Sequence, residues 1–579
     1  MQKNLFPIAA RLFLLCSIAC CTTVNASTLD GTHYSEMYRK MTAQAQGVQP
    51  LSGDIFGEQT DLYSGNTSFS ITDIELPGNS ALSVRLGRSL QVEDRKDTGY
   101  IGGFSDWDVD VPYIESTVDS NGWKVAPSGA NAYNRCTSQA PPHFSNSFFI
   151  GTAWHGITIN IPGSSHEKLL VSHTSTFSAP ADGKSYPWTT LGNVRISCLA
   201  STKNGYPGEG FIALTPSGEK YYFDWVIERA APKLVGPRVS YYAENILIRK
   251  RVFLLATRVE DRFGNWVNYT YSGDKLSQIS ANDGRTITLT YSGASVATAS
   301  DGSRIWSYQY AAPSTTSEGG LSKVTLPDGT KWQYQKLGFL ISGRRGDPDL
   351  LGADTWDPTC MEAEGAPMSP FKMVVTHPSN AIGEFSFTQN RQYRTNVPWL
   401  CRWVVPPGQR PMAGATSVQT LTAFNQSLYD ELISRGVSIS RATIAATSEV
   451  NIWEEGTTFE WQPGVDELLI PNYSDQLSLQ TKKISGPGVP VRTTSYSYGE
   501  VDTFGFCGYG GDPQCAEVQV TPDTPIGSKW VTVTKPDGVK DRYRFGVQYG
   551  LTEGRLLQSQ TLSPSNVVLN SQSNEYVSE

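Results

Sequence analysis

The sequence predicts a mostly β protein, in which antiparallel β-hairpin repeats form an extended or partly closed β-sheet shell next to a loop-rich β N-terminal region. Three observations lead to this prediction. The 579 residues include 53 glycines and 34 prolines, which is typical of a turn-rich chain. Thr, Ser, Tyr, Val and Trp are plentiful and helix-forming runs are scarce, which favours strands. Asp-Gly pairs recur before Tyr-rich segments, which is typical of hairpins.

The bulk composition sets the scale and excludes one class of partner. With 39% apolar and 11% aromatic residues, the chain is long enough for several packed domains and is not a disordered protein. Its formal net charge is −8. An acidic chain without a basic patch is a poor match for nucleic acid, so no nucleic-acid partner is predicted.

The first 26 residues predict export. Lys3 and Arg11 precede an apolar run over 12–19, and Val24-Asn25-Ala26 follows as a small-residue cleavage site. The run is shorter than the roughly 20 apolar residues that span a bilayer, so we expect a cleaved signal peptide and no membrane span afterwards. Cleavage removes two cations and takes the formal charge from −8 to −10. Lipid attachment at Cys20 is the alternative, which would tether the protein.

The cysteines that remain after cleavage are Cys136, Cys198, Cys360, Cys401, Cys507 and Cys515. Six cysteines allow fifteen pairings, and the sequence suggests only one locally, because Cys507 and Cys515 bracket a Gly-rich segment. We therefore expect disulfides in an oxidising compartment. The ligand spacing of a zinc site is missing.

The N-terminal region predicts strands and turns after a polar lead-in. Residues 27–50 form this lead-in, with a short helix expected at Tyr34–Ala45. Strands are expected within 62–76 and 82–86. A further strand is expected over 106–112, with its acids on one face and Trp107, Val109 and Val111 on the other.

A repeat occupies the centre of the chain. Each copy runs from an Asp-Gly or Phe-Gly pair to a strand rich in Thr and Tyr. The glycines of the first three copies are spaced by 20 and 18 residues. Asp-Gly suits the two φ > 0 positions of a type I′ turn, so we place these pairs at hairpin tips and expect neighbouring hairpins to join into a continuous sheet. The pairs are Asp283-Gly284, Asp301-Gly302, Asp328-Gly329 and Asp537-Gly538.

The copies resemble the YD repeats of Rhs-type proteins. In that family a Gly-containing turn leads to a Tyr-x-Tyr strand and then to Gly-Arg-Leu. The matching segments are Tyr269-Thr-Tyr271, Tyr308-Gln-Tyr310, Tyr496-Ser-Tyr498 and Gly554-Arg-Leu556. The resemblance implies a hollow β-shell that encloses a toxin cargo. The chain is similar to the N-terminal part of a large exported bacterial protein of this kind, although its clear copies are few and it lacks the family's Asp-Pro-x-Gly cleavage motif.

The predicted organisation follows from these segments. It consists of a signal peptide (1–26), the lead-in (27–50), a loop-rich β domain (51–205), YD-type repeats (206–345), an inserted or intermediate β region (346–490) and further YD-like hairpins (491–579).

Catalytic chemistry is not predicted. The sequence has no G-x-S-x-G, H-E-x-x-H or phosphate-binding loop motif, so we predict no catalytic, cofactor-binding or metal-binding residues and no cofactor. Two further patterns are poor matches for metal sites. Four histidines (His143, His155, His166 and His173) lie between Cys136 and Cys198, and Asp106, Asp108 and Asp110 share one strand face.

Three function classes stay open. The first, which we favour, is an exported non-enzymatic scaffold that encapsulates or presents a toxin or another protein partner. The second is a cell-surface adhesin or glycan-binding protein, because aromatic side chains on strands can stack on sugar rings. The third is a secreted hydrolase whose carboxylate pair assembles only in the fold.

Overall fold

The computed structural model describes residues 55–93, 100–144, 154, 156–163, 165–172, 180, 182–240, 243–338, 370–393, 453–454, 473–499, 527–547 and 552–576. All regular elements in these ranges are strands, and nearly all pair antiparallel, which confirms the predicted mostly β fold. None of the described residues forms a helix long and apolar enough to cross a membrane. The signal peptide, the helix expected at 34–45 and the pair Cys507–Cys515 lie outside the described residues.

The first strands along the described chain form a small sheet, here called the inner sheet. Its strands pair in the order β1-β2-β3-β5-β4. They are β1 (Glu58–Thr60), β2 (Thr67–Leu76), β3 (Val84–Gln91), β4 (Gly103–Phe104) and β5 (Trp107–Val109). The expected alternation is confirmed, because Trp107, Val109 and Val111 are buried.

A second group of strands follows and leads into a long hairpin. It comprises β6 (Tyr113–Asp119), β7 (Ile157–Ile161), β8 (Ser165–Lys168), β9 (Leu170–Val171), β10 (Trp188–Thr189), β11 (Arg195–Leu199), β12 (Gly210–Leu214), β13 (Lys220–Ser240) and β14 (Ala243–Glu260). The disulfide Cys136–Cys198 joins the loop after β6 to β11. β14 pairs with β13 on one edge and with β6 and then β15 on the other.

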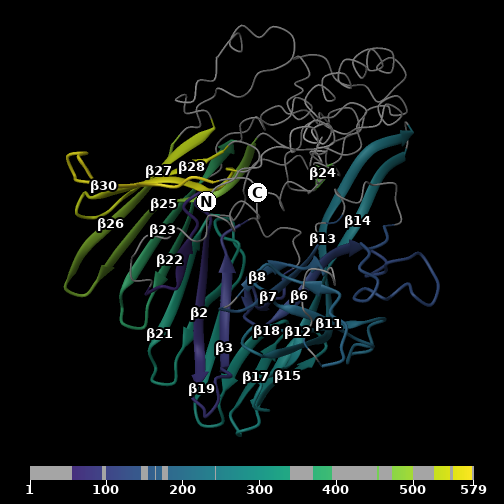
Figure 1. Ribbon diagram of the computed structural model, residues 1–579. Coiled ribbons are helices and arrows are strands. Elements are labelled where there is room, and N and C mark those ends of the chain that lie inside the picture. Colours follow the sequence, from purple (N-terminus) through teal and green to yellow (C-terminus); the bar gives the residue numbers. More distant parts are fainter. Residues whose placement is uncertain are drawn as a thin grey trace, which may run out of the picture.

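The remaining strands form the repeat sheet, whose hairpins fan out around the inner sheet (Figure 1). They are β15 (Trp266–Ser272), β16 (Lys275–Ala281), β17 (Thr286–Ser292), β18 (Ser295–Ser300), β19 (Ile305–Ala311), β20 (Gly320–Thr325), β21 (Lys331–Leu337), β22 (Phe371–Thr376), β23 (Ile382–Tyr393), β25 (Tyr473–Gly486), β26 (Val489–Tyr498), β27 (Ser528–Thr534), β28 (Lys540–Gly546), β29 (Leu556–Leu562) and β30 (Val568–Ser573). The short β24 (Trp453–Glu454) pairs with β13 instead. Consecutive hairpins do join into one sheet, as predicted.

The Asp-Gly pairs lie at hairpin tips, but the predicted type I′ turn is wrong. Only the glycine of each pair has a positive φ, for example +82° at Gly329. The Gly329 N–H donates to Leu326 O at 3.0 Å and the Leu326 N–H donates to Thr330 O at 2.9 Å, which closes a three-residue loop with a left-handed glycine. Asp328 keeps an ordinary φ because its carboxylate accepts the Thr330 N–H at 2.9 Å.

A tyrosine at the end of a strand marks each repeat. The hydroxyl groups of Tyr271, Tyr291 and Tyr310 donate to backbone carbonyl oxygens of the preceding strand, at 2.7–2.8 Å. The pairing register also shifts at each of these tyrosines, which is the mark of a β-bulge. Because a bulge bends and twists its strand, a bulge at every repeat helps to curve the sheet.

Candidate functional site: the inner face of the repeat sheet

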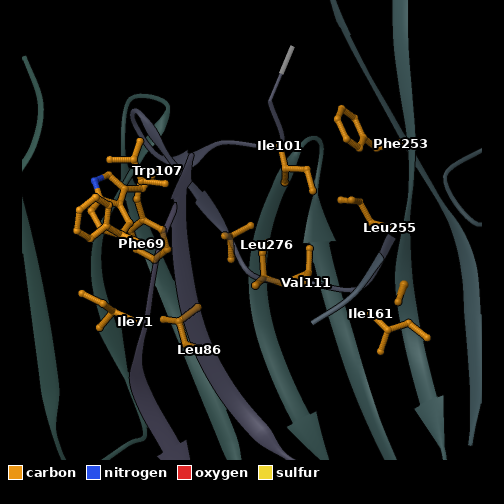
Figure 2. Close-up of a cluster of buried hydrophobic side chains, with 14 of the residues drawn as sticks. Phe69, Ile71, Leu86, Ile101, Trp107, Val111, Ile161, Phe253, Leu255 and Leu276 are labelled. Carbon is orange, nitrogen blue, oxygen red and sulfur yellow. The ribbon is translucent and has the colours of Figure 1, made fainter. Parts of the chain in front are cut away.

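The inner face of the repeat sheet is occupied by the inner sheet. Figure 2 shows Phe69, Ile71 and Leu86 of the inner sheet close to Leu276 of β16, and all four belong to one buried cluster. Ring contacts extend this packing to later strands: Phe104 meets Tyr308 of β19, Trp107 meets Tyr334 of β21 and Phe69 meets Phe385 of β23, with centroids 4.8–5.1 Å apart. One small sheet thus touches many hairpins at once.

A buried ion pair lies at the centre of this interface. Asp73 is the extra residue of a bulge in β2, between the register pairs of Thr72 and Ile74. Arg88 of β3 donates from Nε to Asp73 Oδ2 at 2.9 Å, and both side chains are fully buried. The repeat sheet completes the cluster, because Arg88 Nη2 donates to Tyr334 Oη at 2.6 Å and Tyr308 Oη donates to Asp73 Oδ2 at 3.0 Å.

Two neighbouring aromatic rings lie against the Arg88 guanidinium. Its Cζ lies 4.7 Å from the Trp107 ring centre and 4.9 Å from the Tyr334 ring centre. Burial by itself lowers the pKa of Arg88, but the Asp73 carboxylate and the Tyr334 hydroxyl outweigh burial, and the pKa lies above its ordinary value. Arg88 therefore keeps its charge, and its bonds to Asp73 and Tyr334 tie the two sheets together.

A second buried pair holds the loop before β2. Asp61 accepts the N–H groups of Tyr63 and Ser64 at 3.1 Å each and forms the turn of this loop. Lys529 of β27 donates to Tyr63 O at 2.6 Å, and its Nζ lies 4.0 Å from the centre of the Tyr63 ring. Burial raises the pKa of Asp61 to about 6 and lowers the pKa of Lys529 to about 7, while each charge partly offsets the other's shift.

Two further lysines anchor the inner sheet in the same way. Lys336 of β21 pairs with Asp106, and Lys482 of β25 pairs with Glu58. Both lysines are at most 5% exposed. With Lys529 they are three buried lysines on β21, β25 and β27, each meeting an acid or a carbonyl oxygen between residues 58 and 106.

The tip of one repeat also contacts the inner sheet. Arg285 follows Asp283-Gly284 and donates to Leu76 O at 2.9 Å and to Leu82 O at 3.3 Å. The hairpin β16–β17 thereby holds the turn between β2 and β3. A Cβ on Gly78 in that turn would lie 2.1 Å from Arg285 Cζ, so the backbone approaches the guanidinium as closely as glycine allows.

The candidate metal ligands on β5 and beside it do not form a shared site. Asp106 pairs with Lys336, Asp108 accepts the Gly102 N–H at 2.6 Å, and Asp110 pairs with Arg85 at 3.1 Å. Within the described ranges no group of three or more His, Cys, Asp or Glu could hold a metal ion. His155 and His173 lie outside those ranges.

The sequence interpretation missed the charged residues of the inner face. An isolated cation on a strand is expected to face solvent, but four such cations are buried here: Arg88, Lys336, Lys482 and Lys529. Strand alternation could have revealed the burial of Lys336, because it shares a strand face with Trp332 and Tyr334.

Comparisons with known proteins assign no family. No family model matches the chain, and no curated protein matches it. Among solved structures it is similar to the N-terminal domain of effector protein SpvB from Salmonella typhimurium strain LT2, with 12% sequence identity and a TM-score of 0.18. That match covers 55% of this chain and 95% of the other.

Proposed function

We propose that this chain is an exported, non-enzymatic scaffold of the YD-repeat kind, whose curved sheet encloses or presents a toxin or another protein partner. One observation carries the proposal. The inner sheet and the loop between β1 and β2 contact strands from β16 to β28, whereas the last hairpin is left open: Val567, Val568 and Leu569 are 49–62% exposed. Apolar residues next to each other on an exposed strand suit contact with another protein chain.

Two features support export and a structural role. The disulfide Cys136–Cys198 suits an oxidising compartment. The buried charged groups of the inner face are engaged in holding two sheets together, which is a structural use. No observation on the described residues favours the hydrolase alternative.

The test is co-expression with the product of the neighbouring downstream gene, followed by size-exclusion chromatography and limited proteolysis. We expect co-elution and protection of the β28–β30 hairpins by the partner. Val568→Asp with Leu569→Asp should abolish co-elution, whereas the control Ile305→Asp, at an equally exposed strand position, should not. Absence of a complex, or a complex insensitive to the double variant, would contradict the proposal.

A further inference from the structure

The molecule has an open depression away from the inner face. It has a volume of about 550 Å³ and is lined by Asn204, by the β13 segment 225–229 and by the tip of the β15–β16 hairpin at Gly273 and Asp274. This volume lies in the range of small-molecule sites. The feature uses none of the buried lysines that meet the inner sheet, although its Arg229 also bonds the segment just before β4.

A tryptophan in a fixed orientation forms one wall. Trp225 is half-buried and stacks on Tyr271, with ring centres 5.6 Å apart and planes 25° apart. Its Nε1 donates to Gly273 O at 2.8 Å, so the indole plane is held by both contacts. Val226 and Ile227 supply buried apolar surface beside it. A preorganised aromatic wall of this kind favours a ligand with a flat apolar face.

The rim of the depression is polar but its charges are paired. Arg229 Nη2 lies 3.1 Å from Asp274 Oδ2, and the Asp274 side chain is 53% exposed. Glu228 pairs with Lys250 at 2.7 Å and accepts the Tyr206 hydroxyl at 2.8 Å. The Arg229 guanidinium also donates to Tyr100 O at 2.9 Å and to Ile101 O at 3.1 Å, so its N–H groups are largely taken up within the protein. The rim thus offers carboxylate oxygens to a ligand while carrying no uncompensated charge.

We infer that this depression binds a carbohydrate, with one pyranose ring stacked on Trp225 and its hydroxyl groups donating to the carboxylates of Asp274 and Glu228. A pyranose is neutral, has an apolar C–H face and carries hydroxyl groups at its edge, which matches an aromatic wall with a paired polar rim. A phosphorylated ligand fits less well, since the cations already have anionic partners and the chain is acidic. This inference does not depend on the proposed scaffold role.

The experiment uses the full mature chain and three probes: lactose, maltotriose and chitotriose. Saturation-transfer NMR and calorimetry should detect binding of at least one, with the strongest saturation on ring C–H protons. Trp225→Ala should weaken binding at least tenfold and Asp274→Ala several-fold. Trp266→Ala is the matched control, because Trp266 is also half-buried on a strand but does not line the depression, and it should bind as the unaltered chain does.

Two results would overturn the inference. One is the absence of binding for all three probes. The other is binding that survives both Trp225→Ala and Asp274→Ala; the latter variant changes only a half-exposed hairpin tip, so it keeps the test decisive even where Trp225→Ala does not fold. Co-elution with a protein partner is unaffected in either case, so failure here is distinguishable from failure of the scaffold proposal.

Discussion

The Lys529 ammonium lies 4.0 Å from the centre of the Tyr63 ring, and it donates to the carbonyl oxygen of the same residue. These contacts join β27 to a loop 466 residues earlier in the chain. They place a cation in a buried site next to Asp61, whose carboxylate is also buried. The site therefore links the attachment of the N-terminal segment to pH.

The first prediction concerns this pH dependence. Burial lowers the pKa of Lys529 from 10.5 to about 7, so between these values the unfolded chain holds the extra proton and the free energy of unfolding rises with pH. Burial raises the pKa of Asp61 from 3.8 to about 6, so over that range the folded chain holds the extra proton and the free energy of unfolding falls as pH rises. The pair contributes least to stability between about pH 6 and pH 7.

Urea unfolding at several pH values checks this prediction. The free energy of unfolding of the unaltered chain minus that of Lys529→Met should increase from neutral to alkaline pH. The difference between the unaltered chain and Asp61→Asn should decrease from about pH 4 to pH 6. Differences that do not change with pH would show that burial does not shift the pKa of either group.

The second prediction concerns Arg88 and Asp73. Arg88→Met should lower the free energy of unfolding by about 3–5 kcal/mol, because it leaves a buried carboxylate without its cation. The double variant Arg88→Met with Asp73→Asn should recover part of this loss, since no buried charge remains. The control is Arg304→Met, whose pair with Asp301 is solvent-exposed on the arginine side and should cost about 1 kcal/mol or less. Equal losses in the two arginine variants would contradict the structural role given to Arg88.

The hairpins could be predicted from the sequence, because their signals are local. Asp-Gly pairs and Tyr-x-Tyr strands lie within about 20 residues of each other, and the paired strands form where expected. The turn type was predicted wrongly, because only the glycine of each Asp-Gly pair is left-handed, whereas a type I′ turn needs two left-handed residues. Pro378-Ser379-Asn380 and Pro564-Ser565-Asn566 form the same loop, with Asn in the left-handed position. Their Pro-Ser-Asn pattern was a readable signal.

The main strands of the inner sheet were predicted, but their position against the repeat sheet could not be. Arg88 meets Tyr334 across 246 residues of chain, so no sequence window contains both partners. A buried lysine or arginine also looks like a surface residue until its acid is placed beside it. The candidate site therefore depends on tertiary pairing, whereas the strands depend on local turns and alternation.

The third prediction tests the tyrosine at the end of each repeat. Tyr291→Phe should lower the free energy of unfolding by about 1 kcal/mol, because the hydroxyl that donates to Leu276 O at 2.8 Å is lost. Tyr269→Phe is the matched control, since no hydrogen bond from its hydroxyl to a described residue is present. Denaturant unfolding of both variants gives the comparison. If both lose the same amount, the hydroxyl bond is not what stabilises the repeat.

The fourth prediction separates two reasons why a position needs glycine: a positive φ and the close approach of another segment. Gly329 has a φ of +82° with no atom within 4 Å of an added Cβ, so Gly329→Val should cost about 1 kcal/mol or more through backbone strain alone. At Gly65 the φ is +76° and a Cβ would lie 2.5 Å from Tyr498 Cζ, so Gly65→Ala should cost more than Gly329→Ala. Gly486→Ala, whose Cβ meets nothing closer than 3.6 Å, should be nearly neutral. Thermal melts rank the variants, and a harmless Gly65→Ala would contradict the close approach of the two segments.

The last prediction concerns the disulfide Cys136–Cys198, whose cysteines are 62 residues apart in the chain. In the loop-entropy model, closing a loop of that length raises the free energy of the unfolded chain by about 4 kcal/mol. The double variant Cys136→Ser with Cys198→Ser should lose a comparable amount, measured by denaturant unfolding under oxidising conditions. The same measurement with a reducing agent is the control: the reductant should lower the free energy of unfolding more in the unaltered chain than in the double variant.

Because Trp188 Nε1 donates to Cys136 O at 2.7 Å and Glu209 accepts the Cys136 N–H at 2.8 Å, the loop should keep its local contacts without the covalent bond. The near-ultraviolet signal of the folded double variant should therefore stay close to that of the unaltered chain, and a collapse of that signal would show that the disulfide also sets the local conformation.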